Sequence, residues 1–134
     1  MLVVFDLDGT LACSAHRKHH LPDYEAWYEA CVNDEPIQPA VTIARDCIKL
    51  GYRVEVWTAR HELDRPNTTK WVNNHLGRLA TIRMMADGTQ TDAMFKLELA
   101  MRYRPDLVYE NDLGCIRAYQ KAGVFTCYVG RLIP

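Results

Sequence analysis

The chain has 134 residues, which suffices for one domain with a hydrophobic core and is too short for two. Its composition is 49% hydrophobic and 25% charged with a net charge of −1, so no overall basic field indicates non-specific nucleic-acid binding. The five cysteines are dispersed without a CxxC pair, no apolar run approaches the roughly 20 residues of a membrane span, and the first residues resemble a strand rather than a signal peptide. We therefore expect a reduced, cytoplasmic protein without a membrane segment.

The first predicted element is a buried strand over residues 2–5, an uncharged run of β-branched and aromatic residues. Asp6 and Asp8 follow it and project to the same side of an extended chain. Two neighbouring carboxylates are unfavourable unless a cation or a phosphoryl group shares the site. The alternative is that Asp8 and Gly9 simply form the turn after the strand.

A small insert is expected next, at about residues 12–36. Its polar stretch, residues 13–22, precedes a predicted helix over residues 23–33 that begins at the capping residue Asp23. The insert is too short for a separate domain, so we expect a helical flap beside an open site.

The rest of the chain alternates between helices and strands. The predicted helices cover residues 39–51, 65–77, 91–103 and 112–123, and the predicted strands cover residues 52–58, 79–85, 106–110 and 124–130. This alternation predicts one α/β domain over residues 1–134, built on a doubly wound five-stranded parallel sheet with right-handed crossovers. Ligands of such folds bind beyond the carboxyl ends of the strands.

Other polar residues follow the strand ends. Thr58 ends one predicted strand, and Glu110, Asn111 and Asp112 lie at the end of another. Their oxygens suit a hard cation such as Mg²⁺, while Lys96 could neutralise a phosphate. Taken singly, Thr58 also fits ordinary strand propensity, and Lys96 fits a surface helix residue paired with Asp92 four positions earlier.

The order of these residues resembles the haloacid dehalogenase superfamily of phosphotransferases. The resemblance covers essentially the whole chain. Within this superfamily, the chain resembles the 3′-phosphatase domains of bacteriophage-type polynucleotide kinases more closely. Arg17 and Arg60 match arginines that follow the first and second motifs of those domains, and Asp92 matches the aspartate before the lysine. Arg83 matches the arginine of the strand that follows.

The resemblance implies a Rossmann-like core and a set of residue roles. Asp6 would be the nucleophile and Asp8 the general acid and base, while Thr58 and Lys96 would hold phosphoryl oxygens and Asp92 would orient Lys96. Substrate would be bound by Arg17, Arg60, Arg83, Gly9 and Thr10, and Mg²⁺ by Asp6, Asp8, Glu110 and Asn111. Because the family usually has two aspartates where this chain has Glu110 and Asn111, Asp112 also remains a candidate metal ligand.

The absence of room for a full cap domain predicts an open site that admits a polynucleotide end. Basic residues around it, including Arg65 and Lys70, suit phosphate contacts, although a solvated loop is the alternative. Trp27, Tyr28 and Trp71 are expected in the core rather than as stacking platforms for bases.

The leading hypothesis is thus a Mg²⁺-dependent phosphomonoesterase that forms an aspartyl-phosphate and acts on 3′-phosphate ends. A nucleotidase or other small-molecule phosphatase is the first alternative, and a catalytically weak binding module is the second. Kinase activity is not expected, because the sequence has no GxxxxGK[ST] loop.

Overall fold

Five parallel strands form the centre of the protein, in the order β5-β4-β1-β6-β7. The structure is a computed structural model that describes residues 1–86 and 88–130. The strands are β1 (Leu2–Asp6), β4 (Arg53–His61), β5 (Thr81–Met85), β6 (Leu107–Glu110) and β7 (Thr126–Tyr128). The single domain predicted over residues 1–134 extends four residues beyond the described part.

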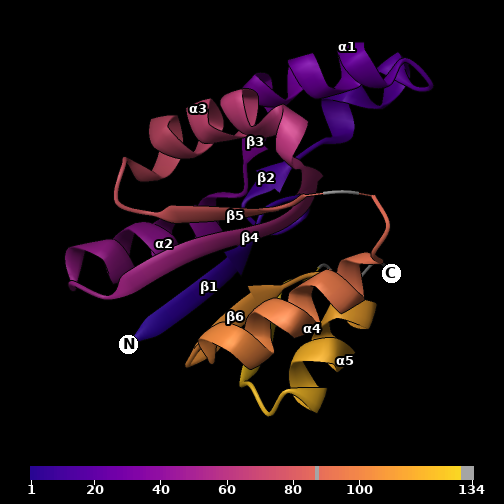
Figure 1. Cartoon of the computed structure of the whole chain (residues 1–134). Coiled ribbons are helices and arrows are strands. Elements are labelled where there is room, and N and C mark those ends of the chain that lie inside the picture. The colour runs from indigo at the N-terminus through magenta and orange to yellow at the C-terminus, as the bar shows by residue number, and fades with distance from the viewer. Residues whose placement is uncertain (87, 131–134) are drawn as a thin grey trace.

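Helices cover both faces of this sheet (Figure 1). One face carries α2 (Gln38–Lys49) and α3 (Arg65–Leu76), and the other carries α4 (Asp92–Tyr103) and α5 (Leu113–Lys121). The predicted doubly wound parallel fold is confirmed. In the described residues, no helix is both long enough and apolar enough to cross a membrane.

The central strand β1 contributes to two cores, because successive strand residues point to opposite faces. Val3 and Phe5 pack among residues of α2 and α3. Val4 packs on the opposite face, in a cluster that includes Tyr119 of α5. Both faces of β1 are covered, and a strand pairs with each of its edges. Its carboxyl end, where Asp6 lies, is therefore the part of β1 that a ligand can approach.

The insert between β1 and α2 is a small structure of its own. It comprises β2 (Ala12–Cys13), η1 (Ala15–His20), α1 (Tyr24–Glu29), η2 (Ala30–Asn33) and β3 (Glu35–Pro36). The Asp23 side chain caps α1 by accepting a hydrogen bond from the Ala26 amide. The helix predicted over residues 23–33 is therefore present as α1 and η2. The antiparallel β2–β3 pair was not predicted, since two-residue strands have no detectable periodicity.

Strand β4 is longer than predicted. Thr58 was expected at its end, but the strand continues to His61, and its pairing with β5 changes register between Thr58 and His61. Such an irregularity bends a strand and redirects its side chains, and it is common beside active sites. It lies where Thr58 and Arg60 face the pocket described below.

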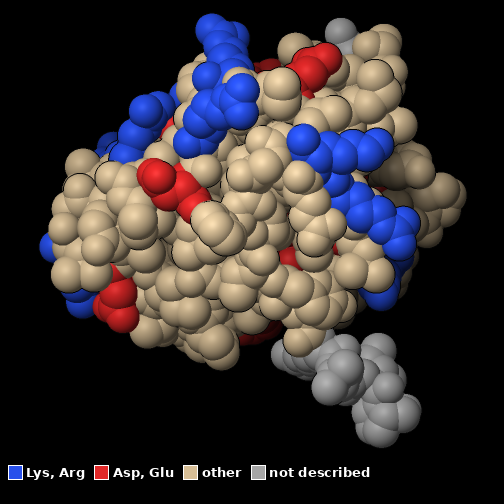
Figure 2. Space-filling view, turned by 90° about the horizontal axis from the view of Figure 1, so that it is seen from below, with Lys and Arg blue, Asp and Glu red and all other residues tan. Residues whose placement is uncertain are grey.

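Charge is distributed without one dominant field on the face seen in Figure 2. Lys and Arg side chains lie in separate groups toward the margins, Asp and Glu lie among them, and much of the middle is uncharged. This agrees with the net charge of −1.

Candidate active site

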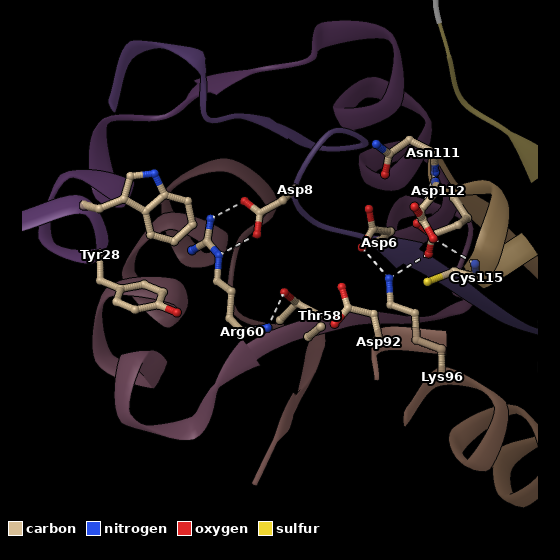
Figure 3. Close-up of a pocket in the computed structure, with 13 residues that line it drawn as sticks. Asp6, Asp8, Tyr28, Thr58, Arg60, Asp92, Lys96, Asn111, Asp112 and Cys115 are labelled. Atoms are coloured by element: carbon tan, nitrogen blue, oxygen red, sulfur yellow. Dashed lines mark hydrogen bonds and ion pairs between the residues drawn. The ribbon is translucent and has the colours of Figure 1, made fainter. Parts of the chain in front are cut away.

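A pocket of about 340 Å³ lies at the carboxyl ends of β1, β4 and β6 (Figure 3). It brings together most residues that the sequence singled out, namely Asp6, Asp8, Thr58, Arg60, Asp92, Lys96, Glu110, Asn111 and Asp112. The lining does not include Gly9, Thr10, Arg17 or Arg83. The lining residues meet here because the carboxyl ends of parallel strands share one edge of the sheet.

The centre of the pocket wall is one ammonium between two carboxylates. Lys96 Nζ donates to Asp6 Oδ1 at 2.6 Å and to Glu110 Oε2 at 2.7 Å, and all three side chains are buried. Burial alone would lower the pKa of Lys96, but the carboxylates, led by Asp6, outweigh it and raise that pKa. The cation is thus fixed beside Asp6 even though it has little contact with water.

Burial raises the pKa of both carboxylates of this cluster. Burial raises the pKa of Asp6, and the Lys96 ammonium opposes this effect. Burial and the charge of Asp6 raise the pKa of Glu110 to about 7. The other oxygen of Glu110 accepts bonds from the amides of Asn111 and Asp112, each at 3.2 Å. Both Glu110 oxygens are therefore engaged in holding Lys96 and the chain that follows β6.

The side chain of Asn111 lies between Asp6 and the main chain of Asp8. With its amide nitrogen facing them, it donates to Asp6 Oδ2 at 2.8 Å and to the Asp8 carbonyl at 3.1 Å. The oxygen and nitrogen of such an amide are assigned by their partners rather than observed directly. If the oxygen faces the same two atoms, three oxygens converge, which is the arrangement that a cation requires.

Gly9 allows this close approach of Asn111. It has a φ of +85°, and a Cβ placed there would collide with the side-chain amide group of Asn111. Next to it, the buried Thr10 hydroxyl donates to Asp6 Oδ2 at 3.1 Å. These two residues therefore shape the surroundings of Asp6, whereas the sequence analysis placed them in substrate binding.

Asp8 points away from Asp6, across the pocket toward Arg60 (Figure 3). Arg60 donates to both of its oxygens, from Nε at 2.9 Å and from Nη2 at 2.7 Å. Arg17 Nη2 adds a third bond at 3.3 Å. The two arginines were predicted to bind substrate. The structure instead places their guanidinium groups against Asp8.

Asp34 holds both arginines, and the sequence analysis missed it. It is 2% exposed and accepts bonds from Arg17 Nε at 2.8 Å and from Arg60 Nη2 at 3.2 Å. Its main-chain carbonyl accepts a bond from Trp71 Nε1 at 2.9 Å. The sequence carries no local signal for Asp34, because which carboxylate of the insert is buried among the arginines depends on tertiary packing.

Thr58 and Asp92 also line the pocket. The buried Thr58 hydroxyl accepts a bond from the Arg60 amide at 3.2 Å, so its own proton can be directed at a ligand. Asp92 begins α4 one turn before Lys96. The carboxylates that receive the Lys96 bonds are those of Asp6 and Glu110, so the structure gives Asp92 a place in the lining and no orienting contact with Lys96.

Arg83 lies apart from these groups. On β5 it donates to Glu55 Oε1 at 2.6 Å and to the Tyr103 hydroxyl at 3.0 Å, with its guanidinium over the Tyr103 ring. Glu55 is fully buried. Arg83 therefore pairs with a charge inside the fold, and we do not retain it as a substrate ligand.

The three aromatic residues expected in the core occupy different places. Trp71 is fully buried, as predicted. Trp27 and Tyr28 are half-buried and line the pocket instead. The prediction was wrong for Trp27 and Tyr28, because α1 packs against the other short elements of the insert, η1 and η2, and has no fully buried residue.

Comparison with known proteins gives a family match, which covers nearly the whole chain. A family model described as the polynucleotide kinase PNKP phosphatase domain matches residues 1–129. No curated protein sequence matches the chain.

Solved structures show the same fold. A chain of the Pnkp1/Rnl/Hen1 RNA repair complex has a TM-score of 0.77 at 18% identity, with 96% of this chain and 42% of that chain covered. A second structure of that complex gives a TM-score of 0.75 at 20% identity, covering 96% and 45%. The D,D-heptose 1,7-bisphosphate phosphatase from B. bronchiseptica, complexed with magnesium and phosphate, has a TM-score of 0.59 at 13% identity and coverage of 93% and 78%. The present chain thus spans less than half the length of the two repair-complex chains.

Proposed function

The chain belongs to the polynucleotide kinase phosphatase domain family of the haloacid dehalogenase superfamily, and on that premise we propose that it removes phosphate from the 3′ ends of polynucleotides. The observation that carries the proposal is Asp6, held by Lys96 in a pocket that also contains Asp8. A carboxylate fixed at the end of a central strand is a suitable nucleophile toward phosphorus.

In the proposed first step, an oxygen of Asp6 attacks the phosphorus atom. The Asp6 O–P bond forms while the bond from phosphorus to the 3′ oxygen breaks, and the leaving oxygen takes a proton from Asp8. In the second step, water attacks the aspartyl-phosphate and gives a proton to Asp8, which releases inorganic phosphate and restores Asp6. The hydrogen bonds from Arg60 and Arg17 hold the Asp8 side chain in its direction.

Asp8 carries a proton from the second step of one turnover to the first step of the next. Both of its oxygens accept hydrogen bonds from arginines. To take up and hold that proton, one oxygen has to exchange a guanidinium hydrogen bond for a proton of its own. We therefore assign Arg60 and Arg17 to positioning Asp8 rather than to binding the strand.

The transferred phosphoryl group would be held by Lys96 and Thr58. An ammonium has three N–H donors, and two of those of Lys96 are directed at Asp6 and Glu110, which leaves one for a phosphoryl oxygen. The Thr58 hydroxyl can donate to a second oxygen. Such preorganised donors stabilise the charge that develops in the transition state.

The residues present also fit Mg²⁺. Asp6 Oδ2, the Asp8 carbonyl and the Asn111 side chain converge within hydrogen-bond distance, and oxygen is the donor that Mg²⁺ prefers. Within residues 1–86 and 88–130, no group of three His, Cys, Asp or Glu side chains could hold a metal ion. The donor set described here differs from such a group, because it combines one carboxylate with a main-chain carbonyl and a side-chain amide. When bound, the ion would offset the charge that Asp6 and a phosphate bring together. Glu110 is engaged with Lys96 and Asp112 caps α5, so neither is assigned as a ligand.

A polynucleotide end is favoured over a small substrate by two observations. The family match is to the phosphatase domain of polynucleotide kinases, and one structure of similar fold comes from an RNA repair complex. In addition, the insert has only short elements between β1 and α2, with none of the mass of an enclosing cap domain. A strand can leave such a site toward solvent.

The test compares phosphate release from four kinds of substrate. These are 3′-phosphorylated RNA, 3′-phosphorylated DNA, the 5′-phosphorylated forms of the same strands, and free 3′-mononucleotides. We expect the 3′-phosphorylated strands to give the highest kcat/KM. Asp6→Asn should lower kcat by at least about a thousandfold while the melting profile stays close to that of the wild type. Acid quenching followed by mass spectrometry should detect phosphate on Asp6 of the wild type alone. A preference for mononucleotides would refute the assignment in favour of a nucleotidase.

A further inference from the structure

The direction of Asp8 shows where the leaving group has to lie. In an in-line displacement, the leaving oxygen departs on the side of phosphorus opposite Asp6, and it must come within hydrogen-bond reach of the group that protonates it. Asp8 points toward Arg60, on the side of the pocket where Tyr28 lies (Figure 3). The nucleoside attached to the leaving oxygen therefore extends toward α1.

Two aromatic rings of α1 face the pocket on that side. Trp27 and Tyr28 line it and are both half-buried. The rings meet edge to face, with centroids 4.9 Å apart. The Arg17 guanidinium lies 3.9 Å from the centroid of the Trp27 ring and also donates to the Trp27 carbonyl at 3.1 Å.

These contacts hold the aromatic pair in place before any ligand arrives. Arg17 is fully buried and tied to Asp34, so it fixes one face of the indole. Base stacking on such a surface does not depend on base identity, because every base has a π-face. The arrangement suits a site that must accept any strand terminus.

We propose that Trp27 and Tyr28 form a stacking site for the base of the nucleotide that carries the scissile 3′-phosphate. This inference rests on the proposed function and specifies what the enzyme recognises beyond the phosphate. A second cavity of about 610 Å³ borders Gly9, Asn111 and Tyr128. Neither Asp6 nor Asp8 lines it, so it cannot receive the leaving oxygen.

The kinetic test compares two strands that differ only at the terminal nucleotide. One has a base on the sugar that bears the 3′-phosphate, and the other has an abasic sugar there. Trp27→Leu and Tyr28→Leu should each lower kcat/KM on the base-bearing strand by about 5- to 100-fold, the range expected for loss of a stacked base. The same variants should lower kcat/KM on the abasic strand by less than about twofold. On the base-bearing strand, Trp27→Phe should lower kcat/KM by less than Trp27→Leu does, because the phenyl ring can still stack.

Tyr24→Leu is the matched control, because Tyr24 lies on the same helix, is 63% exposed and does not line the pocket. It should leave both substrates unaffected. Equal losses on the two strands for the Trp27 and Tyr28 variants would overturn the stacking site and leave the phosphatase assignment intact.

A binding measurement separates this inference from the proposed activity. Trp57 and Trp71 are fully buried, so Trp27 is the tryptophan that a ligand in the pocket can contact. In an Asp6→Asn background, the base-bearing strand should quench tryptophan fluorescence, and the abasic strand or the additional Trp27→Phe change should remove most of that quenching. Identical quenching by both strands would refute stacking even if phosphate release proceeds as proposed. Conversely, base-dependent quenching without any phosphate release by the wild type would refute only the activity.

Discussion

Asn111 is the residue at which this chain departs most from the pattern it resembles, because an amide stands where an aspartate is usual. It contacts Asp6 and the Asp8 carbonyl directly. An amide oxygen can bind Mg²⁺, but it brings no charge. At the proposed Mg²⁺ site, the substitution would therefore affect how strongly the ion is bound rather than where it lies.

We expect Asn111→Asp to lower the Mg²⁺ concentration that gives half-maximal activity by about tenfold, since affinity rises with the charge of the ligand set. Without metal, the same variant should melt at a lower temperature than the wild type, because a third carboxylate is added beside Asp6 and Glu110. Magnesium should then raise its melting temperature by more than that of the wild type. Thermal unfolding with and without Mg²⁺ measures this independently of turnover, and an unchanged response to Mg²⁺ would contradict the assigned site.

Strands β4 and β5 are joined by a buried ion pair that the sequence did not reveal. Glu55 accepts bonds from Arg83 and from Trp57 Nε1, and Arg53 lies beside it. Burial alone would raise the pKa of Glu55, but the hydrogen bonds and charges of these neighbours outweigh it and lower that pKa. A carboxyl whose pKa is lowered by folding stabilises the protein above its unfolded pKa, and that stabilisation is lost as the pH falls through its folded pKa.

Arg83→Leu should therefore destabilise the protein by about 3 kcal/mol at neutral pH, because it leaves Glu55 buried beside only the partly exposed Arg53. The deficit should shrink as the pH falls from 7 through the ordinary carboxyl range, because Glu55 of the variant takes up a proton there. Urea unfolding at pH 7 and at pH 4 measures both effects. Below the unfolding transition, kcat/KM should be close to the wild-type value. A large loss of kcat/KM with unchanged stability would instead support Arg83 as a substrate ligand.

At the scale of the whole molecule, Asp34 links the insert to the sheet and to α3. One carboxylate receives bonds from His16 and Arg17 of η1 and from Arg60 of β4, and its carbonyl receives one from Trp71 of α3. This cluster also positions Asp8. The fold of the insert and the geometry of Asp8, the proposed general acid, are therefore coupled through the same buried charge.

Asp34→Asn should lower the free energy of unfolding by about 3 kcal/mol, since Arg17 stays buried with its charge poorly balanced. It should also reduce kcat and speed proteolysis within residues 14–33, where η1 and α1 lose their attachment. His16→Ala is the control, because the His16 side chain is 36% exposed and its loss leaves both arginine contacts of Asp34 in place. Wild-type kcat in Asp34→Asn would show that the cluster does not control Asp8.

The fold itself was accessible from local patterns. The apolar run before Asp6, the glycines that end helices and the regular alternation of elements identify a doubly wound sheet, because secondary structure depends on periodicity within short windows. The same patterns place Asp6, Asp8, Thr58, Lys96 and the residues after Glu110 at strand ends or on the adjoining helix, and hence near one edge of the sheet. They do so without information on where any side chain points.

The sequence by itself thus determined the architecture and placed most of the candidate site residues at the carboxyl edge of the sheet. Only the tertiary structure decided their partners: Arg17 and Arg60 with Asp8 and Asp34, Arg83 with Glu55, and Trp27 and Tyr28 at the pocket rather than in the core. The reason is physical. The paired residues are 9 to 52 positions apart in the sequence, and the geometry of each pair is set by packing among elements that no local pattern records.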